Sequence, residues 1–264
     1  LDKWKNKTIL IDAWKQFNDD CPQFIQSAIG NYCQYQIKNC GWEGEHDWRK
    51  QLLAWEKQVC DIIMQESVYS EGMVAKCCVE SIDEGGKLFI GNSMPIRDVD
   101  MFSLTSSKKI HIYSNRGASG IDGIISSALG MCNNSNNKNS LLLIGDVSFY
   151  HDMNGLLASR YGANLTIVVI NNSGGGIFSF LPIANSGLEN FQQYWTTDTN
   201  LKINKVADLY NCKYYFAENL NEVKKSIRES FKCRGVKIIE VKTSISKNIL
   251  AHKHMSEKVK SALI

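Results

Sequence analysis

The chain has 264 residues and a formal net charge of +3, from 30 basic and 27 acidic side chains. Charges of both signs are interspersed, so the composition predicts neither a nucleic-acid partner nor a membrane-surface partner. No apolar segment is long enough to predict a membrane span. The nine cysteines form no CxxC pair, and a chain of this size needs no disulfide framework, which predicts free thiols.

The N-terminal quarter has a less regular pattern than the rest of the chain. Its first residues, Leu1-Asp2-Lys3-Trp4, include no initiator methionine and no targeting pattern. We therefore expect a piece of a longer polypeptide. Residues 8–11 favour a strand, whereas residues 22–29 and 47–64 favour helices.

From Ser70 onward, strand and helix patterns alternate. Ser70 suits the N-cap of a helix over 71–82, and Pro95 suits the first turn of another helix. Short apolar runs predict strands over 87–90, 109–113, 140–144, 165–170, 213–216 and 236–241. Helical patterns fall over 119–131, 152–161, 205–210 and 220–231. The alternation predicts an α/β fold, a doubly wound and mostly parallel sheet with helices on both faces.

Polar or glycine-rich blocks follow four of the expected strands. They begin at Gly91, Ser114, Gly145 and Asn171. Ligands of doubly wound sheets bind at the carboxyl ends of the strands. The position of the four blocks therefore predicts one binding site at that edge of the sheet.

Two of these blocks carry metal-ligand chemistry. Gly145-Asp146 and Asn171-Asn172 end two strands that a helix-length stretch connects, and a right-handed crossover places both ends at one edge. Carboxylate and amide oxygens suit Mg²⁺ rather than zinc. The glycine-rich run over 173–176 lets backbone approach a ligand closely. The pattern predicts a Mg²⁺-bridged diphosphate, although Asp146 by itself is also typical of an ordinary turn.

The Gly-Asp and Asn-Asn pairs, with a helix-length spacer, resemble the thiamine-diphosphate signature of the pyruvate-decarboxylase-like enzymes. The blocks over 91–97, 114–123 and 175–182 further resemble the branch that acts in menaquinone and phylloquinone biosynthesis. The wider family has a second glycine where this chain has Val147, and that branch tolerates a branched aliphatic residue there. The resemblance implies a C-terminal remnant of a central domain over 1–66 and a thiamine diphosphate/Mg-binding domain over 67–250. The remaining tail over 251–264 is polar and weakly helical in pattern.

The resemblance implies thiamine diphosphate and Mg²⁺ (or Mn²⁺) as cofactors. It assigns the metal to Asp146, Asn172 and the backbone carbonyl of Gly174. A helix after Ser148 would direct its first amides at the diphosphate. The implied cofactor-binding residues are Asn92, Ser119, Gly120, Ile121, Gly145, Asp146, Val147, Ser148, Asn172 and Phe178. Among them Ile121 would support the bent cofactor, whereas its residue type by itself favours the core.

Two arginines lie within strand-end blocks, and the guanidinium fork binds carboxylates through two hydrogen bonds. Both implied substrates, 2-oxoglutarate and isochorismate, carry carboxylates. We therefore expect Arg97, Arg116 and Ser93 as catalytic residues, with Arg97, Arg116, Phe178 and Leu181 binding substrate. Two alternatives stay open. Ser93 and Asn92 could cap the helix at Pro95, and Phe178 and Leu181 could be core residues.

The reaction implied by the resemblance is decarboxylation of 2-oxoglutarate and addition of the succinyl-semialdehyde unit to isochorismate. The family's activating glutamate belongs to an N-terminal pyrimidine-binding domain, and no block here matches it. That domain would lie on the same or another chain, in a homodimer or tetramer, and the fragment by itself should be inactive. We expect a plastid enzyme, with the bacterial cytoplasm as the alternative.

Two other functions remain open at this point. One is a different thiamine-diphosphate 2-oxoacid decarboxylase or an acetolactate-synthase-like enzyme, for which the block over 114–121 is atypical. The other is a non-catalytic α/β binding domain that keeps a relic site. Titration with Mg²⁺ and thiamine diphosphate separates a working site from a relic.

Overall fold

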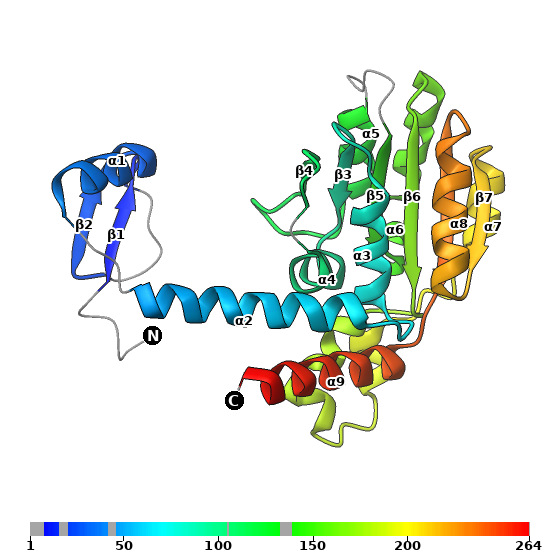
Figure 1. The fold of residues 1–264 in the computed structure, drawn as a ribbon. Coiled ribbons are helices and arrows are strands. Elements are labelled where there is room, and N and C mark those ends of the chain that lie inside the picture. The colour runs from blue at the N-terminus through cyan, green and yellow to red at the C-terminus, as the bar shows by residue number, and fades with distance from the viewer. Residues whose placement is uncertain (1–7, 16–20, 42–45, 105, 133–138, 264) are drawn as a thin grey trace. The chain divides into compact units, whose positions relative to one another are not determined.

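The computed structural model describes residues 8–15, 21–41, 46–104, 106–132 and 139–263 (Figure 1). The chain divides into two compact units, residues 1–56 and 57–264. The start at Leu1–Trp4 lies outside the described residues. Within the described ranges, no helix has the length and apolar character needed to cross a membrane. All nine cysteines are free thiols, as predicted.

The first unit contains two short strands and a helix. Strands β1 (Ile9–Asp12) and β2 (Gln23–Gln26) pair in parallel, and α1 (Ile29–Asn39) follows. The strand expected near residues 8–11 is confirmed. The helix predicted over 22–29 is wrong, because residues 23–26 hydrogen-bond to β1, a non-local pairing that helical spacing does not reveal.

The boundary between the units lies inside α2 (His46–Gln65), the helix predicted over 47–64. It falls between Glu56 and Lys57 rather than after residue 66. The end of α2 belongs to the second unit because Ile63 is buried in a cluster with Met73 and Phe102. That the first residues are the end of a central domain stays a prediction.

The region expected as a separate tail over 251–264 is the C-terminal part of a helix. Helix α9 (Ile245–Leu263) buries Asn248, His252 and Met255. Met255 joins the cluster of Met73 and Phe102. The weakly helical pattern expected there is confirmed, and three buried positions are enough to attach the helix to the second unit.

The second unit is built on a six-stranded parallel sheet with the order β4-β3-β5-β6-β8-β7 (Figure 1). Every neighbouring pair in it runs parallel. The strands are β3 (Lys87–Ile90), β4 (His111–Tyr113), β5 (Ser140–Gly145), β6 (Leu165–Asn171), β7 (Lys213–Ala217) and β8 (Val236–Lys242). The expected doubly wound sheet is confirmed.

Helices cover both faces of this sheet. Helices α3 (Glu71–Ser81), α4 (Met94–Phe102) and α8 (Leu220–Phe231) pack on one face. The other face carries α5 (Ile124–Cys132), α6 (Asp146–Asp152), the 3₁₀ segment η2 (Met153–Tyr161) and α7 (Ile203–Leu209). Successive residues of β5 alternate between the two clusters: Leu141 and Leu143 join one, Leu142 and Ile144 the other. Both faces of the sheet are buried, which explains the continuous apolar runs of its central strands.

Two helices differ from their predicted bounds. The helix predicted over 119–131 begins at Ile124, because Ser119 and Gly123 have φ of 54° and 63°, outside the right-handed helical region. The helix predicted over 152–161 is the 3₁₀ segment η2, and a short α-helix, α6, precedes it from Asp146.

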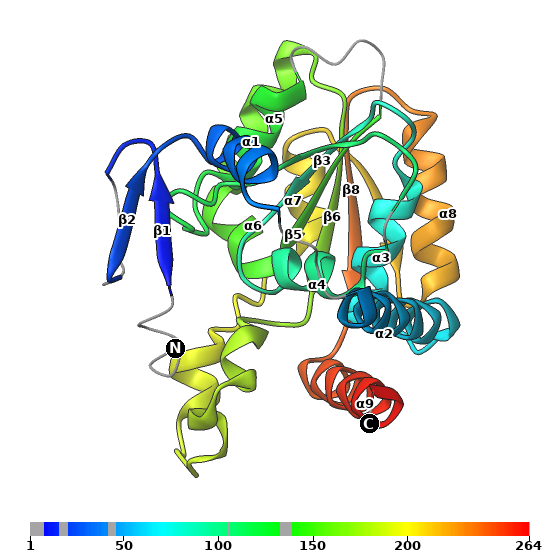
Figure 2. The same cartoon turned by 60° about the vertical axis from the view of Figure 1, so that its left-hand side comes forward.

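The sheet's carboxyl edge opens where the chain changes face. Helix α4 follows β3 on one face, and α6 follows β5 on the other. Neighbouring parallel strands whose following helices diverge leave a crevice at their ends. Figure 2 shows α9 and the segment with η3 (Gly176–Phe180), η4 (Pro182–Asn185) and η5 (Gln192–Thr196) beyond this edge.

Candidate cofactor and metal site

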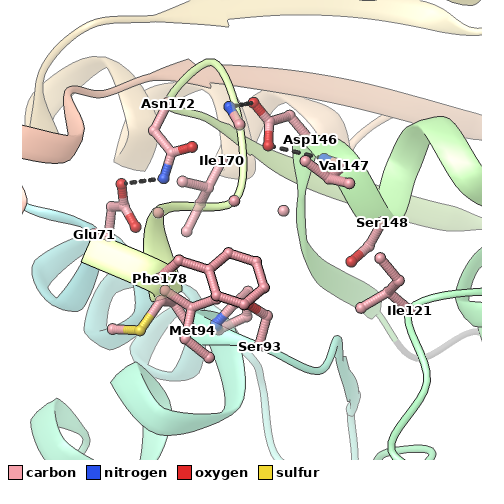
Figure 3. A pocket seen from close by; sticks show the side chains of 16 residues that line it. Glu71, Ser93, Met94, Ile121, Asp146, Val147, Ser148, Ile170, Asn172 and Phe178 are labelled. Atoms are coloured by element: carbon pink, nitrogen blue, oxygen red, sulfur yellow. Dashed lines mark hydrogen bonds between the residues drawn. The ribbon is translucent and has the colours of Figure 1, made fainter. Parts of the chain in front are cut away.

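A cavity of about 140 Å³ lies at the carboxyl ends of β5 and β6. Nine residues predicted for the site line it: Ser93, Ile121, Gly145, Asp146, Val147, Ser148, Asn172, Gly174 and Phe178. Figure 3 labels seven of them, all except the two glycines, and shows their side chains converging from separate elements of the second unit. The remaining lining residues are Glu71, Met94, Pro95, Ile170, Gly175, Gly176 and Ile177.

Asp146 is the first residue of α6 and is 4% exposed. Its Oδ1 accepts a hydrogen bond from the backbone N–H of Val147 at 2.8 Å, and its Oδ2 accepts one from that of Gly174 at 2.9 Å. Burial raises the pKa of Asp146 to about 6, against the lowering effect of these backbone bonds. The carboxylate is therefore held rigidly and desolvated, a state that a bound cation would stabilise.

Asn172 lies one residue beyond β6 and presents two different ends. Its Nδ2 donates to Oε1 of Glu71 at 2.9 Å. Its Oδ1 is buried and accepts no hydrogen bond from the described residues. In Figure 3 the nitrogen faces Glu71 and the oxygen points away from it. A buried acceptor without a partner is costly, so it indicates a ligand position.

The backbone at Gly174 is held close to another loop. Gly174 has φ of 142°, and a Cβ there would lie 2.3 Å from the carbonyl oxygen of Thr196. The neighbouring N–H of Gly175 donates to that same oxygen. The Gly174 carbonyl accepts one bond from Gly176 at 3.0 Å, which leaves a second lone pair.

Asn171 and Asn172 have separate environments. Asn171 Nδ2 donates to Oε1 of Glu240 on β8 at 2.6 Å, and its Oδ1 accepts from the backbone N–H of Ser173 at 3.2 Å. Lys242 donates to Ser173 Oγ at 2.9 Å. The first asparagine thus attaches the loop to β8, while the second faces the cavity.

These groups fit a hard divalent cation. A desolvated carboxylate, a buried amide oxygen without a partner and a backbone carbonyl supply oxygen ligands of the kind that Mg²⁺ and Mn²⁺ prefer. The fit rests on Asn172 Oδ1, which has no hydrogen-bond donor among the described residues, although a buried oxygen normally has one.

The helix expected after Ser148 begins earlier. Helix α6 starts at Asp146, with Gly145 at its N-cap position. One amide of its first turn, that of Val147, is occupied by the Asp146 carboxylate. The first turn of α6 therefore orients the Asp146 carboxylate and also forms part of the cavity wall.

The two predicted arginines lie outside the cavity lining. Arg116 is exposed and its Nη1 donates to Oδ1 of Asn92 at 3.0 Å. Asn92 is buried, and its Nδ2 also donates to the carbonyls of Asn115 at 3.0 Å and Gly120 at 2.5 Å. Asn92 therefore connects the end of β3 to the loop after β4 through hydrogen bonds and does not line the cavity.

Arg97 and Ser93 are joined on α4. Arg97 is exposed, and its Nη1 donates to the backbone carbonyl of Ser93 at 2.6 Å. Ser93 occupies the N-cap position of α4, as the capping alternative expects, but its side chain makes no cap bond to the described residues. Its φ of 72° is unusual for a residue with a side chain. Ser93 lines the cavity, as Figure 3 shows.

The predicted apolar residues separate in the structure. Ile121 is half-buried and lines the cavity, so it is not a core residue. Phe178 lines the cavity and meets Trp195 edge-on, with ring centroids 5.4 Å apart. Leu181 is 44% exposed and does not line it. Ser119 and Gly120 also lie outside the lining, although Ile121 of the same loop is part of it.

Glu71 is the lining residue that sequence reasoning missed. It is 1% exposed in the first turn of α3. Burial raises its pKa to about 7, although hydrogen bonds from Asn172 and Thr243 act in the opposite direction. One signal was available: a helix that leads into a parallel strand begins at the sheet's carboxyl edge, so the acid after Ser70 had to lie there.

The family model described as thiamine pyrophosphate enzyme, C-terminal TPP binding domain, matches residues 100–241. With the parallel sheet and the strand-end site, this match defines the chain as a thiamine-diphosphate-binding α/β domain. The chain belongs to the C-terminal TPP-binding domain family of thiamine pyrophosphate enzymes. Thiamine diphosphate is the cofactor that the family's name specifies.

Curated relatives narrow the likeness to one kind of enzyme. The 2-succinyl-5-enolpyruvyl-6-hydroxy-3-cyclohexene-1-carboxylate synthase of Oceanobacillus iheyensis is 42% identical over 200 residues, 75% of this chain and 34% of the relative. That of Listeria innocua is 41% identical over 82% of this chain and 38% of the relative. That of Bacillus cytotoxicus is 36% identical over 94% and 43%. The chain thus spans less than half the length of these relatives.

A solved structure agrees on the fold. The benzoylformate decarboxylase of Polynucleobacter necessarius superposes with a TM-score of 0.55 over 66% of this chain and 33% of that chain. The sequence identity is 19%, so this likeness supports the architecture and not the substrate.

Proposed function

We propose that this chain is the diphosphate- and metal-binding part of a 2-succinyl-5-enolpyruvyl-6-hydroxy-3-cyclohexene-1-carboxylate synthase. The complete enzyme would release CO₂ from 2-oxoglutarate and add the remaining succinyl-semialdehyde unit to isochorismate, in menaquinone or phylloquinone biosynthesis. Similarity to synthases of that name supports this choice among thiamine enzymes. The observation that carries it is the buried, unpartnered Oδ1 of Asn172 in the same cavity as the desolvated carboxylate of Asp146.

We assign the metal to Asp146 Oδ, Asn172 Oδ1 and the Gly174 carbonyl. When bound, thiamine diphosphate supplies the chemistry that stabilises the negative charge left by loss of CO₂. The metal would offset the diphosphate charge, and Gly145, Val147, Ser148 and Ile121 would shape the cavity around the cofactor. These residues would hold and orient the metal and the cofactor and would exclude water from them.

The arginines and neighbouring residues are proposed to bind carboxylates. Arg97 lies on α4 and Arg116 on the loop after β4, and each is exposed and so accessible to a substrate or another domain. Ser93 and Phe178 line the same cavity as the proposed metal ligands. Asn92, Ser119, Gly120 and Leu181 keep their proposed cofactor or substrate roles for the complete enzyme, in which another domain would face them.

The remaining proposals concern the whole protein. An N-terminal pyrimidine-binding domain, on this or another polypeptide, would supply the activating glutamate, and the complete enzyme would form a homodimer or tetramer. The relatives named above are bacterial, which favours the bacterial-cytoplasm alternative and lends no support to a plastid location.

The test measures CO₂ release from 2-oxoglutarate, with saturating thiamine diphosphate and Mg²⁺, by this chain and by a longer protein that joins it to a relative's N-terminal domain. We expect no turnover from the chain and isochorismate-dependent product from the longer protein. An Asp146→Ala version of the longer protein is the control for background. Robust turnover by the 264-residue chain would show that one of its own carboxylates activates the cofactor.

A further inference from the structure

Glu71 makes contacts that the proposed metal site does not by itself require. Its Oε1 accepts hydrogen bonds from Asn172 Nδ2 and from Thr243 Oγ1, each at 2.9 Å. The side chain is buried in the cavity wall, 1% exposed. Figure 3 shows it on the far side of the Asn172 amide from Asp146.

These two bonds determine how the Asn172 amide is oriented. A side-chain amide has a donor end and an acceptor end of nearly equal size, so its shape does not select one orientation. An oxygen that receives donors from both Asn172 and Thr243 acts as an acceptor, so the amide nitrogen must face it. The amide oxygen then faces the opposite direction, where Oδ1 is buried with no donor in the described part of the chain.

We propose that Glu71 is a positioning residue that directs the Asn172 amide oxygen toward the divalent metal. The inference rests on the proposed function, because it takes Asn172 as a metal ligand. Glu71 itself does not touch the metal in this assignment. It acts through the hydrogen bond to Asn172 and through nothing else at the site.

Hydrogen bonds from neighbouring elements fix the position of Glu71. Its backbone N–H donates to Oδ1 of the buried Asn248 on α9 at 3.1 Å. Ser70, the preceding residue, caps α3 by accepting from the backbone N–H of Met73 at 3.3 Å. The first turn of a helix also favours a carboxylate electrostatically. The carboxylate is therefore fixed by α3, α9 and the end of β8 together.

The first experiment measures Mn²⁺ affinity in the presence of thiamine diphosphate, by electron paramagnetic resonance on the 264-residue chain. Loss of a residue that orients a metal ligand typically weakens metal binding about 10- to 100-fold, and we expect that loss for Glu71→Leu. Glu71→Gln keeps an acceptor oxygen and should bind close to wild type. Equal weakening by both changes would overturn the proposal, because one retains the acceptor and the other does not.

Asn248→Ala is the matched control for stability. It removes a buried contact to the backbone of Glu71 but leaves the carboxylate and Asn172 in place. We expect a lower melting temperature with near-normal Mn²⁺ affinity. If the affinity of each variant simply follows its melting temperature, Glu71 has a structural role and the proposal is wrong.

A double-mutant cycle keeps the proposal testable if Glu71→Leu does not fold. Asn172→Asp places two acceptors against each other, and the further change Glu71→Gln restores a donor and an acceptor. We expect the double variant to bind Mn²⁺ at least 10-fold more tightly than Asn172→Asp, and additive effects would overturn the inference. Wild-type chain that binds no Mn²⁺, with or without cofactor, contradicts the proposed function instead, which separates the two failures.

Discussion

Asn172 Nδ2 lies 2.9 Å from Oε1 of Glu71, although the two residues are 101 positions apart in the chain. The bond joins the loop after β6 to the first turn of α3. It shows that the orientation of a proposed metal ligand depends on a helix that precedes the whole central sheet in sequence. The loop over 171–176 and the start of α3 are therefore one functional unit.

The Asp146 carboxylate should be necessary for metal-dependent cofactor binding. Asp146→Ala removes the anionic ligand of the proposed site, so thiamine diphosphate affinity in Mg²⁺ should fall by at least about 10-fold, the loss typical when groups at a metal site are removed. Calorimetry on the chain measures it. Asp100→Ala, at an exposed position on α4, is the matched control. Unchanged affinity in the Asp146 variant would refute the metal assignment.

The arginines should affect substrate use and leave cofactor binding intact. In the longer protein, Arg97→Ala and Arg116→Ala remove a charge that pairs with a substrate carboxylate, which costs about 2–5 kcal/mol when the partner stays buried. We expect kcat/KM for 2-oxoglutarate or isochorismate to fall while thiamine diphosphate affinity stays near wild type. Arg160→Ala, exposed on η2, serves as the control. Loss of cofactor with normal substrate kinetics would contradict the assignment.

Gly174 should not tolerate a side chain. Its φ of 142° and a clash at 2.3 Å with the Thr196 carbonyl both oppose a Cβ, so Gly174→Ala should lower the free energy of unfolding by about 1–3 kcal/mol and weaken Mn²⁺ binding. Gly130→Ala is the contrast, because no atom of the described residues lies within 4 Å of a Cβ there. As an exposed helix position, Gly130 should gain about 1 kcal/mol from alanine. Denaturant unfolding compares the two, and equal effects would contradict the prediction.

A buried lysine should make stability depend on pH. Lys237 is 2% exposed, and burial lowers its pKa from 10.5 to about 8. Between these values the unfolded chain binds more protons than the folded chain, so the free energy of unfolding should rise with pH by up to about 3 kcal/mol. Below pH 8 the lysine is protonated in both states, and the full cost of burying its charge remains.

Lys237→Met tests this directly. The free energy of unfolding of the variant relative to wild type should decline as pH rises from about 8 to 10.5, because the penalty disappears from wild type. Denaturant unfolding across this range measures the difference. Lys232→Met, at an exposed position, should show no such trend. A difference independent of pH would mean that the hydrogen bonds of Lys237 to Asn164 and Gly235 offset the effect of desolvation on its pKa, and it would contradict the prediction.

Residue pattern predicted the sheet and the strand-end site because both depend on short-range information. Each buried strand is a continuous apolar run, and the polar residues that end it must lie at the carboxyl edge once the sheet is parallel. Asp146 and Asn172 followed from that topology, whereas the Gly174 carbonyl came from the family resemblance. The identity of the cofactor was predicted from the family's characteristic motif spacing, because strand-end geometry by itself does not specify a cofactor.

Tertiary structure decided the features that depend on distant contacts. Residues 23–26 form a strand because β1 lies beside them, and α9 is attached because Met255 meets Met73 and Phe102. Arg116 and Asn92 bond to each other outside the cavity. Glu71 enters the site because α3 begins at the carboxyl edge of the sheet. Hydrogen bonds and packing act over a few ångströms in space, and only the folded chain sets which distant residues come that close.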